Sequence, residues 1–135
     1  MANQSLFPNT LFDSRQFDFA QVAIATGGKT IYVAGQTAWN KEMKMPGGTD
    51  VGAQLRQALN NVRLALAAAS ATPSDLVQLH THIVNYSADM LPVIGPILHE
   101  FLDPAHLPAS MLIGVQALAL PELLVEVNAV AVIAP

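Results

Sequence analysis

The last strand of the chain is predicted by an apolar run that contains a single charged residue. Residues 123–133 are rich in β-branched side chains, which favour a strand buried on at least one face. Successive side chains of a strand point to opposite faces, so one face is wholly apolar and the other carries Glu126 and Asn128. A carboxylate in this setting is costly unless it is paired, hydrogen-bonded or protonated. Glu126 is therefore either a structural anchor or the working group of a site.

The first half of the chain predicts two strands and a helix. Residues 19–25 and 30–34 are strand candidates, and the intervening glycine pair favours a turn, so we predict that the two strands form a hairpin. Residues 39–49 are expected to be a loop. Asp50 is a good N-cap for the helix that follows. Its apolar positions recur at helical spacing and define the buried stripe Val51, Leu55, Leu59, Val62 and Leu66.

The second half predicts a strand at 76–84, a helix, a strand at 109–115 and the Glu126 strand. Pro92 and Pro96 suggest an irregular start, so we place the regular helix from about Pro96 to Leu102. The order β-β-α-β-α-β-β indicates one α+β domain, residues 1–135, with both helices on one face of the sheet. The other face is too polar for a core and too apolar for free solvent, which predicts burial against sister subunits in a closed ring. Its polar residues are Gln78, His80, His82, Glu126 and Asn128.

Composition narrows the function classes. Only 12% of the residues are charged, which is low for a lone monomer and supports subunit contact. The net charge of −4 argues against nucleic-acid binding, and the chain has no cysteine and no apolar run of the ~20 residues that a membrane span needs. No secretory signal is visible at the N-terminus, so we expect a cytoplasmic protein. No Lys or Arg follows Arg63, whereas all four histidines lie in the second half.

Several short motifs together resemble the RidA/YjgF family of enamine/imine deaminases. Phe19-Ala20-Gln21 stands where that family usually has Tyr-Ser-Gln, and the segment 31–36 resembles its Val-Phe-Val-Ser-Gly-Gln. The segment 57–62 resembles its Gln-x-x-x-Asn-Val, and 108–110 resembles its Pro-Ala-Arg. The segment 115–127 is similar to its Val-x-x-Leu-Pro-Leu-Pro-Gly-x-Leu-Val-Glu-Ile. The resemblance covers roughly residues 19–133. It implies a chorismate-mutase-like fold with a mixed sheet, in trimers, with one cofactor-free cleft for a small molecule at each subunit interface.

This sequence departs from the family pattern at the substrate-gripping positions. Ser110 stands where the family has the Arg that holds the substrate carboxylate, a bidentate task that few residues can replace. Phe19 lacks the hydroxyl of the family Tyr, and Gly95 stands where an Asn is usual. Glu126 is kept as the candidate catalytic residue. The resemblance then implies a neutral or more apolar substrate, with the candidate contacts Phe19, Gly35, Trp39, Ser110 and Leu112.

Each candidate also has a purely structural interpretation. Glu126 can anchor an interface, Ser110 can satisfy local backbone at a strand start, and Phe19 can be core. His80 and His82 share a strand face with Glu126, so a metal site is conceivable, although two histidines bonded within an interface explain them as well. We predict no metal and no cofactor. His99 and His106 are interpreted as surface or loop residues.

We therefore predict a trimeric, RidA-like protein that binds a small metabolite and hydrolyses an enamine or imine through Glu126. The first competing hypothesis is a ligand-binding module without catalysis, because a fold can outlive its chemistry. The others are a ribonuclease-type activity, which the acidic balance disfavours, and a metal-dependent enzyme.

Overall fold

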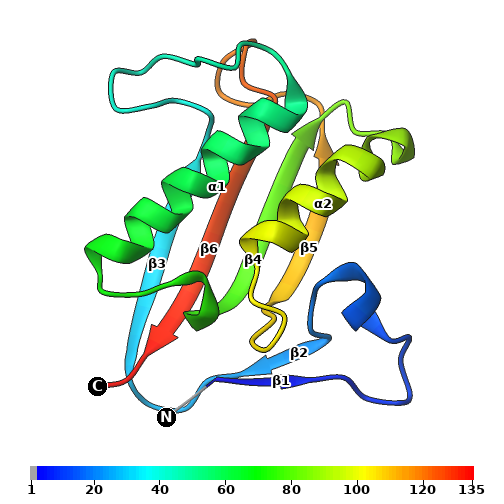
Figure 1. Cartoon of the computed structure of the whole chain (residues 1–135), viewed down its shortest axis with the longest axis vertical. Helices are drawn as coiled ribbons and strands as arrows, with labels where there is room; N and C mark the ends of the chain where they lie inside the picture. Colours follow the sequence, from blue (N-terminus) through cyan, green and yellow to red (C-terminus); the bar gives the residue numbers. More distant parts are fainter. Residues whose placement is uncertain (1–2) are drawn as a thin grey trace.

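The computed structural model describes residues 3–135 and shows a four-stranded sheet with two helices packed on one face (Figure 1). The sheet order is β3-β6-β4-β5, and β1 and β2 form a separate two-stranded sheet. The predicted α+β class with a mixed sheet is therefore confirmed. The strands are β1 (Gln4–Leu6), β2 (Val22–Ile24), β3 (Lys29–Gln36), β4 (Leu76–Val84), β5 (Ala109–Val115) and β6 (Val125–Ile133). The helices are α1 (Val51–Ala68) and α2 (Leu91–Phe101), with short 3-10 turns η1 (Ser14–Phe17), η2 (Pro73–Asp75) and η3 (Ala88–Met90).

Strand pairing fixes which side chains share a face. β6 lies between β3 and β4 and is antiparallel to both, whereas β4 and β5 are parallel and are joined by the α2 crossover. Leu79 pairs with Ala129 on one side and with Ser110 on the other, so these three side chains belong to the helix-covered face. His82 pairs with Glu126 and with Ile113, which places them on the opposite face.

The core lies between the helices and the sheet. Four residues of the apolar face of β6 are buried in this core, namely Val125, Val127, Ala129 and Ala131. Four of the five stripe residues predicted for α1 are also buried, and Val51 is half-buried. The largest apolar side chains among the fully buried ones include Leu55, Val62, Leu66, Leu79, Ile83, Ile94, Val125 and Val127.

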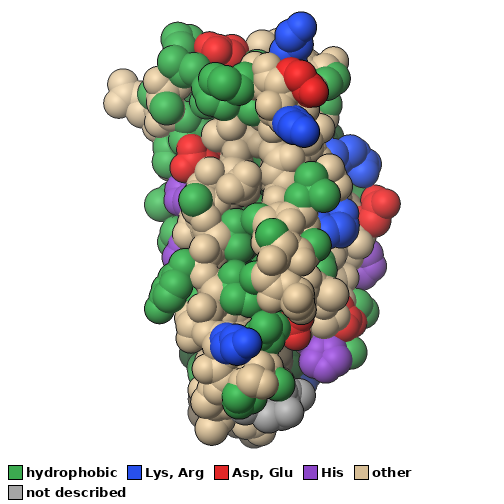
Figure 2. Space-filling view, turned by 90° about the vertical axis from the view of Figure 1, so that its left-hand side faces the viewer, with side chains coloured by type: hydrophobic (Ala, Val, Ile, Leu, Met, Phe, Trp, Pro, Cys, Tyr) green, Lys and Arg blue, Asp and Glu red, His purple; other side chains and the backbone are tan. Residues whose placement is uncertain are grey.

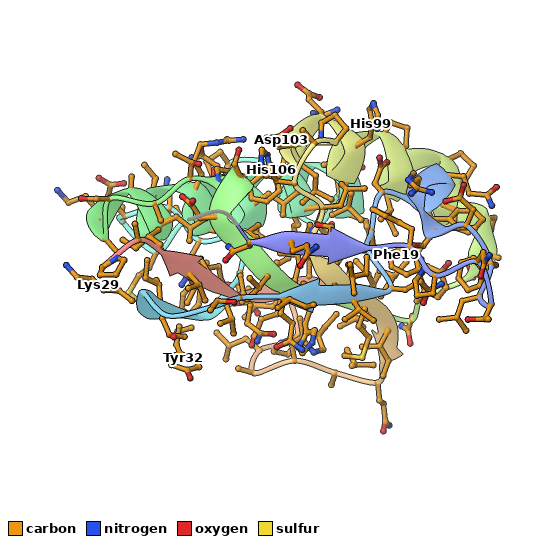
Figure 3. All side chains as sticks on the ribbon, turned by 90° about the horizontal axis from the view of Figure 1, so that it is seen from below. Phe19, Lys29, Tyr32, His99, Asp103 and His106 are labelled. Carbon is orange, nitrogen blue, oxygen red and sulfur yellow. The ribbon has the colours of Figure 1, made fainter. Side chains whose placement is uncertain are left out.

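The opposite face of the sheet, which we call the open face, has no covering layer formed by residues 3–135. Tyr32 is 80% exposed there, and Met111 and Ile113 are also exposed. In Figure 3, Tyr32 points away from the layer that contains the helices. In Figure 2, hydrophobic and histidine side chains line the left-hand edge of the molecule, and most of the Lys and Arg side chains lie toward the top and the right-hand edge, where further histidines also lie. The predicted mixture of apolar and polar groups on this face is therefore present.

Three sequence predictions about the elements are wrong. The predicted order β-β-α-β-α-β-β lacks the short strand β1, so the structure has three strands before α1 rather than two. Residues 19–25 and 30–34 do not form a hairpin, because β2 pairs with β1 and β3 pairs with β6. Gly27 and Gly28 do adopt the left-handed backbone of a tight turn, but the long apolar β6 is the better partner for β3. Helix α2 also begins at Leu91 rather than near Pro96. Pro92 fits in the first turn, and Pro96 removes only one helical hydrogen bond, while Ile94, Ile97 and Phe101 are buried.

Gln54 on α1 is a buried polar residue that the sequence pattern did not reveal. It is 1% exposed, and its Nε2 donates to the carbonyl oxygens of Gly48, at 3.0 Å, and Glu122, at 2.8 Å. Its Oε1 accepts from the backbone N–H of Leu124 at 2.8 Å. One side chain thus joins the loop before α1 to the loop before β6.

We expect Gln54→Leu to destabilise the fold by about 1–3 kcal/mol, because it removes the partner of a half-buried backbone N–H. Urea unfolding measures the change. Gln116 is exposed, so Gln116→Leu serves as the control and should stay within about 0.5 kcal/mol of the parent. Equal stability of the two variants would contradict the assignment.

Asp103, just after α2, ties two loops together through its carboxylate. It accepts from Ser74 at 2.8 Å and from the backbone N–H of Ala105 at 3.0 Å, and His106 Nδ1 lies 2.9 Å away. The hydrogen bond from His106 is the main cause that lowers the pKa of Asp103 from 3.8 to about 2, followed by those from Ala105 and Ser74.

A carboxyl whose pKa is lower in the folded state stabilises the fold above its ordinary pKa. This contribution is therefore complete above about pH 4 and is lost as the pH falls toward about 2. We expect Asp103→Asn to flatten the fall in stability over this range, as measured by urea unfolding at several pH values. A slope unchanged from the parent would contradict this role.

No helix within residues 3–135 is long and apolar enough to cross a membrane.

Candidate functional site

Glu126 lies on the open face, near the start of an inner strand of the sheet. It sits on β6, opposite His82 of β4, and is half-buried. His82 Nδ1 is 3.0 Å from the backbone carbonyl oxygen of Glu126, so this nitrogen carries a proton and donates it. The Glu126 carboxylate itself makes no hydrogen bond or ion pair within residues 3–135. The interpretation of Glu126 as an interface anchor concerns contacts with another subunit and stays a prediction.

A β-bulge in β3 shapes the backbone next to Glu126. Val33 pairs with Ala129 and Gln36 with Val127, so β3 has one more residue than β6 over this interval. Bulges of this kind often adjoin functional sites. Gly35 lies in the bulge, and a Cβ at this position would meet the Glu126 carboxylate, only 2.8 Å from Cδ. The absence of a side chain at Gly35 therefore makes room for the carboxylate.

A hollow of about 750 Å³ lies on the helix side of the chain, between η1, α2 and β5. Most of its lining is apolar, including Phe19 and Leu112, and Ser110 contributes a hydroxyl. The backbone N–H of Ala20 donates to the carbonyl oxygen of Pro108 at 2.8 Å, which holds the segment at Phe19 beside the start of β5. The full lining is Gln16, Phe17, Asp18, Phe19, Leu91, Ile94, Gly95, Pro96, Leu98, His99, Ser110 and Leu112.

The three positions at which the sequence resemblance implies a departure from the family pattern meet in this hollow. Phe19, Gly95 and Ser110 all line it, although they come from three different parts of the chain. A Cβ at Gly95 would have no atom within 4 Å, so this position opens into free space. The hollow is consequently larger and less polar than a Tyr, Asn and Arg at these positions would leave it.

The ionisable residues of the hollow are Asp18 and His99. His99 Nδ1 lies 2.9 Å and 3.0 Å from the two carboxylate oxygens of Asp18. Asp18 adopts a left-handed backbone with φ of 60° at the end of η1, where its N–H is bonded to Ser14 and Arg15. Sequence reasoning missed this pair, because the two residues are 81 positions apart and His99 lies in the last turn of an ordinary apolar helix.

Trp39 lies apart from the other candidate contacts. It lines a separate depression with Gln36, Asn61 and Leu64. Asn61 Nδ2 donates to the carbonyl oxygens of Thr37, at 2.9 Å, and Trp39, at 2.7 Å, and Gln57 in turn donates to Asn61 at 3.0 Å. The Gln-x-x-x-Asn motif of α1 therefore holds the loop after β3 in place.

The histidines of β4 do not complete a metal site in the single chain. His80 and His82 share the open face with Glu126, as the alternation predicted. Within residues 3–135, no group of three or more His, Asp or Glu side chains is placed to hold a metal ion.

The predicted site residues thus fall into three groups. Glu126 and Gly35 are together on the open face, whereas Phe19, Ser110 and Leu112 are together in the hollow on the other side of the sheet. Trp39 stands alone. Figure 3 shows the two sides directly, with His99 on the helix side and Tyr32 on the open face.

Comparison with known proteins gives consistent matches. The family model for endoribonuclease L-PSP matches residues 15–133. A Yersinia pestis protein of unknown function, described as YyfB of the conserved Rid protein family, is 41% identical, with 98% of this chain and 100% of that chain covered and a TM-score of 0.90. RidA from an Antarctic Psychrobacter species is 22% identical, with 85% and 88% covered and a TM-score of 0.68. Escherichia coli TdcF, solved with bound serine, is 22% identical, with 86% and 88% covered and a TM-score of 0.67. No curated protein matches this chain.

The class of protein that this fold and these matches define is the Rid type of α+β protein. The chain belongs to the RidA/YjgF family, whose family model carries the description endoribonuclease L-PSP.

Proposed function

We propose that this chain forms a homotrimer that binds a small, uncharged or largely apolar metabolite in clefts between subunits. We further propose that it hydrolyses an enamine or imine there, with Glu126 as the acid–base group. A cytoplasmic location is part of the same proposal, as is independence from metals and cofactors.

The main support for a site between subunits is that Glu126 and the hollow lie on different sides of the sheet in one chain. Glu126 and Gly35 lie on the open face, and Phe19, Ser110 and Leu112 lie on the helix side, so one chain does not unite them. Family resemblance implies clefts at subunit interfaces. Contact between the open face of one copy and the hollow side of a second copy would place the carboxylate of one at the ligand of the other.

The lining of the hollow supports an uncharged or apolar ligand. Ser110 cannot form the paired hydrogen bonds that an Arg gives to a carboxylate. The described lining contains no Lys or Arg, whereas it does contain Asp18. An anionic ligand would therefore meet a carboxylate without a compensating cation.

The chemistry needs one water molecule and one carboxylate. Glu126 accepts a proton as the water oxygen bonds to the carbon of the C=N group, and the nitrogen is protonated as the C=N double bond becomes single. The hydroxyl group of the resulting amino alcohol then loses its proton to the carboxylate, a proton is delivered to the nitrogen, and the C–N bond breaks as the C=O bond forms. The products are a carbonyl compound and ammonia.

The test is ammonia release from a panel of enamines and imines, with and without a carboxylate, compared with Glu126→Gln. We expect turnover of members that lack the carboxylate. No turnover above the variant on any member would remove the enzymatic claim, and a ligand that co-purifies unconverted would then favour a binding module.

Ribonuclease activity is the function that the family description names. The net charge of −4 and the absence of Lys and Arg after Arg63 disfavour it, because RNA binding relies on cations that face phosphates. Steep salt dependence of binding to RNA would revive this candidate.

Trimer formation is a separate prediction with its own measurement. The open face exposes Tyr32, Met111 and Ile113 beside half-buried polar groups, and burying such a face stabilises an assembly. We expect sedimentation at micromolar concentration to give three times the chain mass of 14.3 kDa. A stable monomer would contradict the prediction.

A further inference from the structure

We propose that Asp18 and His99 form a dyad at the rim of the hollow that accepts a hydrogen bond from the ligand. In this dyad, His99 Nε2 takes a hydrogen bond from a hydroxyl or N–H group of an otherwise apolar ligand. This inference rests on the proposed function in one respect, namely that the hollow is where the ligand binds.

The contact geometry determines which nitrogen of His99 is available. Both oxygens of the Asp18 carboxylate lie within 3.0 Å of Nδ1, and a carboxylate can only accept. Nδ1 therefore carries the proton, and in the neutral ring Nε2 is left with a lone pair. No residue in the range 3–135 hydrogen-bonds to Nε2.

The exposure of the two side chains is consistent with a place at the rim of the hollow. His99 comes from the last turn of α2 and its side chain is 67% exposed, whereas the Asp18 side chain is only 20% exposed. Asp18 is thus the fixed partner, and it acts as a positioning residue that orients the ring. His99 is the group that faces both solvent and the hollow, as Figure 3 shows for its outward position on α2.

The surroundings define the chemical class of the ligand. Apart from Asp18 and His99, the lining consists of apolar side chains, Gly95, Gln16 and the Ser110 hydroxyl. The ligand should therefore have an apolar body and a donor group at one end. A carboxylate at that end would face Asp18 and would be repelled.

A second His–Asp pair in the same chain provides a matched control. His106 Nδ1 lies 2.9 Å from Asp103 Oδ2, much as His99 lies from Asp18, but neither His106 nor Asp103 lines the hollow. A change at His106 removes an imidazole with similar bonding from outside the site.

The experiment compares two small probes of similar shape, p-cresol and 4-methylanisole, of which only p-cresol can donate a hydrogen bond. Binding to the full-length protein is followed by NMR of the methyl groups of Ile94, Leu98 and Leu112, which line the hollow. We expect p-cresol to bind about three- to tenfold more tightly, the range that one hydrogen bond provides. His99→Phe should abolish the difference, whereas His106→Gln should preserve it.

The Asp18→Asn variant tests whether Asp18 orients the proton of His99 or merely packs against the ring. An amide can donate to Nδ1, which permits the tautomer with the proton on Nε2. We expect a smaller preference for p-cresol and a changed tautomer in the ¹⁵N spectrum of His99.

The outcomes distinguish the two proposals. Equal affinity of the two probes for the parent protein, or a preference that survives in His99→Phe, would overturn the dyad and leave the hollow as a ligand site. If neither probe shifts the methyl signals of the hollow, both the dyad and the ligand site of the proposed function are wrong.

Discussion

Replacing Glu126 by Gln is expected to lower the rate of ammonia release by about 10²- to 10⁴-fold. The amide has nearly the same shape but cannot accept a proton from water, so the protein keeps its binding surface and loses proton transfer. The Glu126 carboxylate makes no hydrogen bond within residues 3–135, and the change therefore leaves no described donor unpaired. The kinetics of ammonia release measure the effect on kcat.

The control for this variant is a carboxylate elsewhere in the chain. Glu42 lies on the exposed loop after β3, and Glu42→Gln should retain full activity. Urea unfolding should show that Glu126→Gln is as stable as the parent. A Glu126→Gln variant that keeps the rate of the parent would exclude the carboxylate from the chemistry.

The second large effect is expected from Gly35→Ala, which should slow ammonia release by up to about 10²-fold. The added Cβ would lie only 2.8 Å from Cδ of Glu126, so the carboxylate has to move away. A displacement of about 1 Å at a reacting group can cost this much. Because the obstructed group is the end of a flexible side chain, the fold itself should tolerate the methyl group.

The double variant tests whether Gly35 acts through Glu126. If it does, Gly35→Ala should add nothing to the loss already caused by Glu126→Gln, since the group that it displaces no longer transfers protons. Independent, multiplying losses would show instead that the methyl group disturbs another part of the site.

Sequence patterns predicted the regular elements well where one periodicity dominated. The bounds of β4 and β5 are the same as those predicted, and Asp50 caps α1 as expected, with its carboxylate 2.8 Å from the N–H of Ala53. β4 and α1 each bury one clear apolar face, whereas no residue of β5 is fully buried. The local pattern therefore contains the information that determines them.

The partner of β3 and the start of α2 could not be predicted from the local sequence pattern. The glycine turn at 27–28 indicates that the chain changes direction there, but not that β3 will pair with a strand about 100 residues later. Likewise, an apolar helix with two prolines does not show where its first turn begins. In both cases the tertiary contacts decide between arrangements that the local pattern leaves open.

The candidate site was predictable only in part. Motif resemblance pointed to Glu126, Gly35 and Ser110, and Gly35 and Glu126 are indeed neighbours in space. The Asp18–His99 pair depends on a contact between η1 and α2 that no local spacing encodes. The role of Gln54 could not be predicted for a similar reason, because its three partners lie in the loop before α1 and in the loop before β6.

The free space at position 95 has a consequence for how this protein can change. A Cβ added there would meet no atom within 4 Å, and the position lines the hollow, so selection could alter the bound molecule there without rebuilding the scaffold. The crossover helix thus offers a site for diversification, and for laboratory redesign, that is largely uncoupled from the packing that holds the domain together.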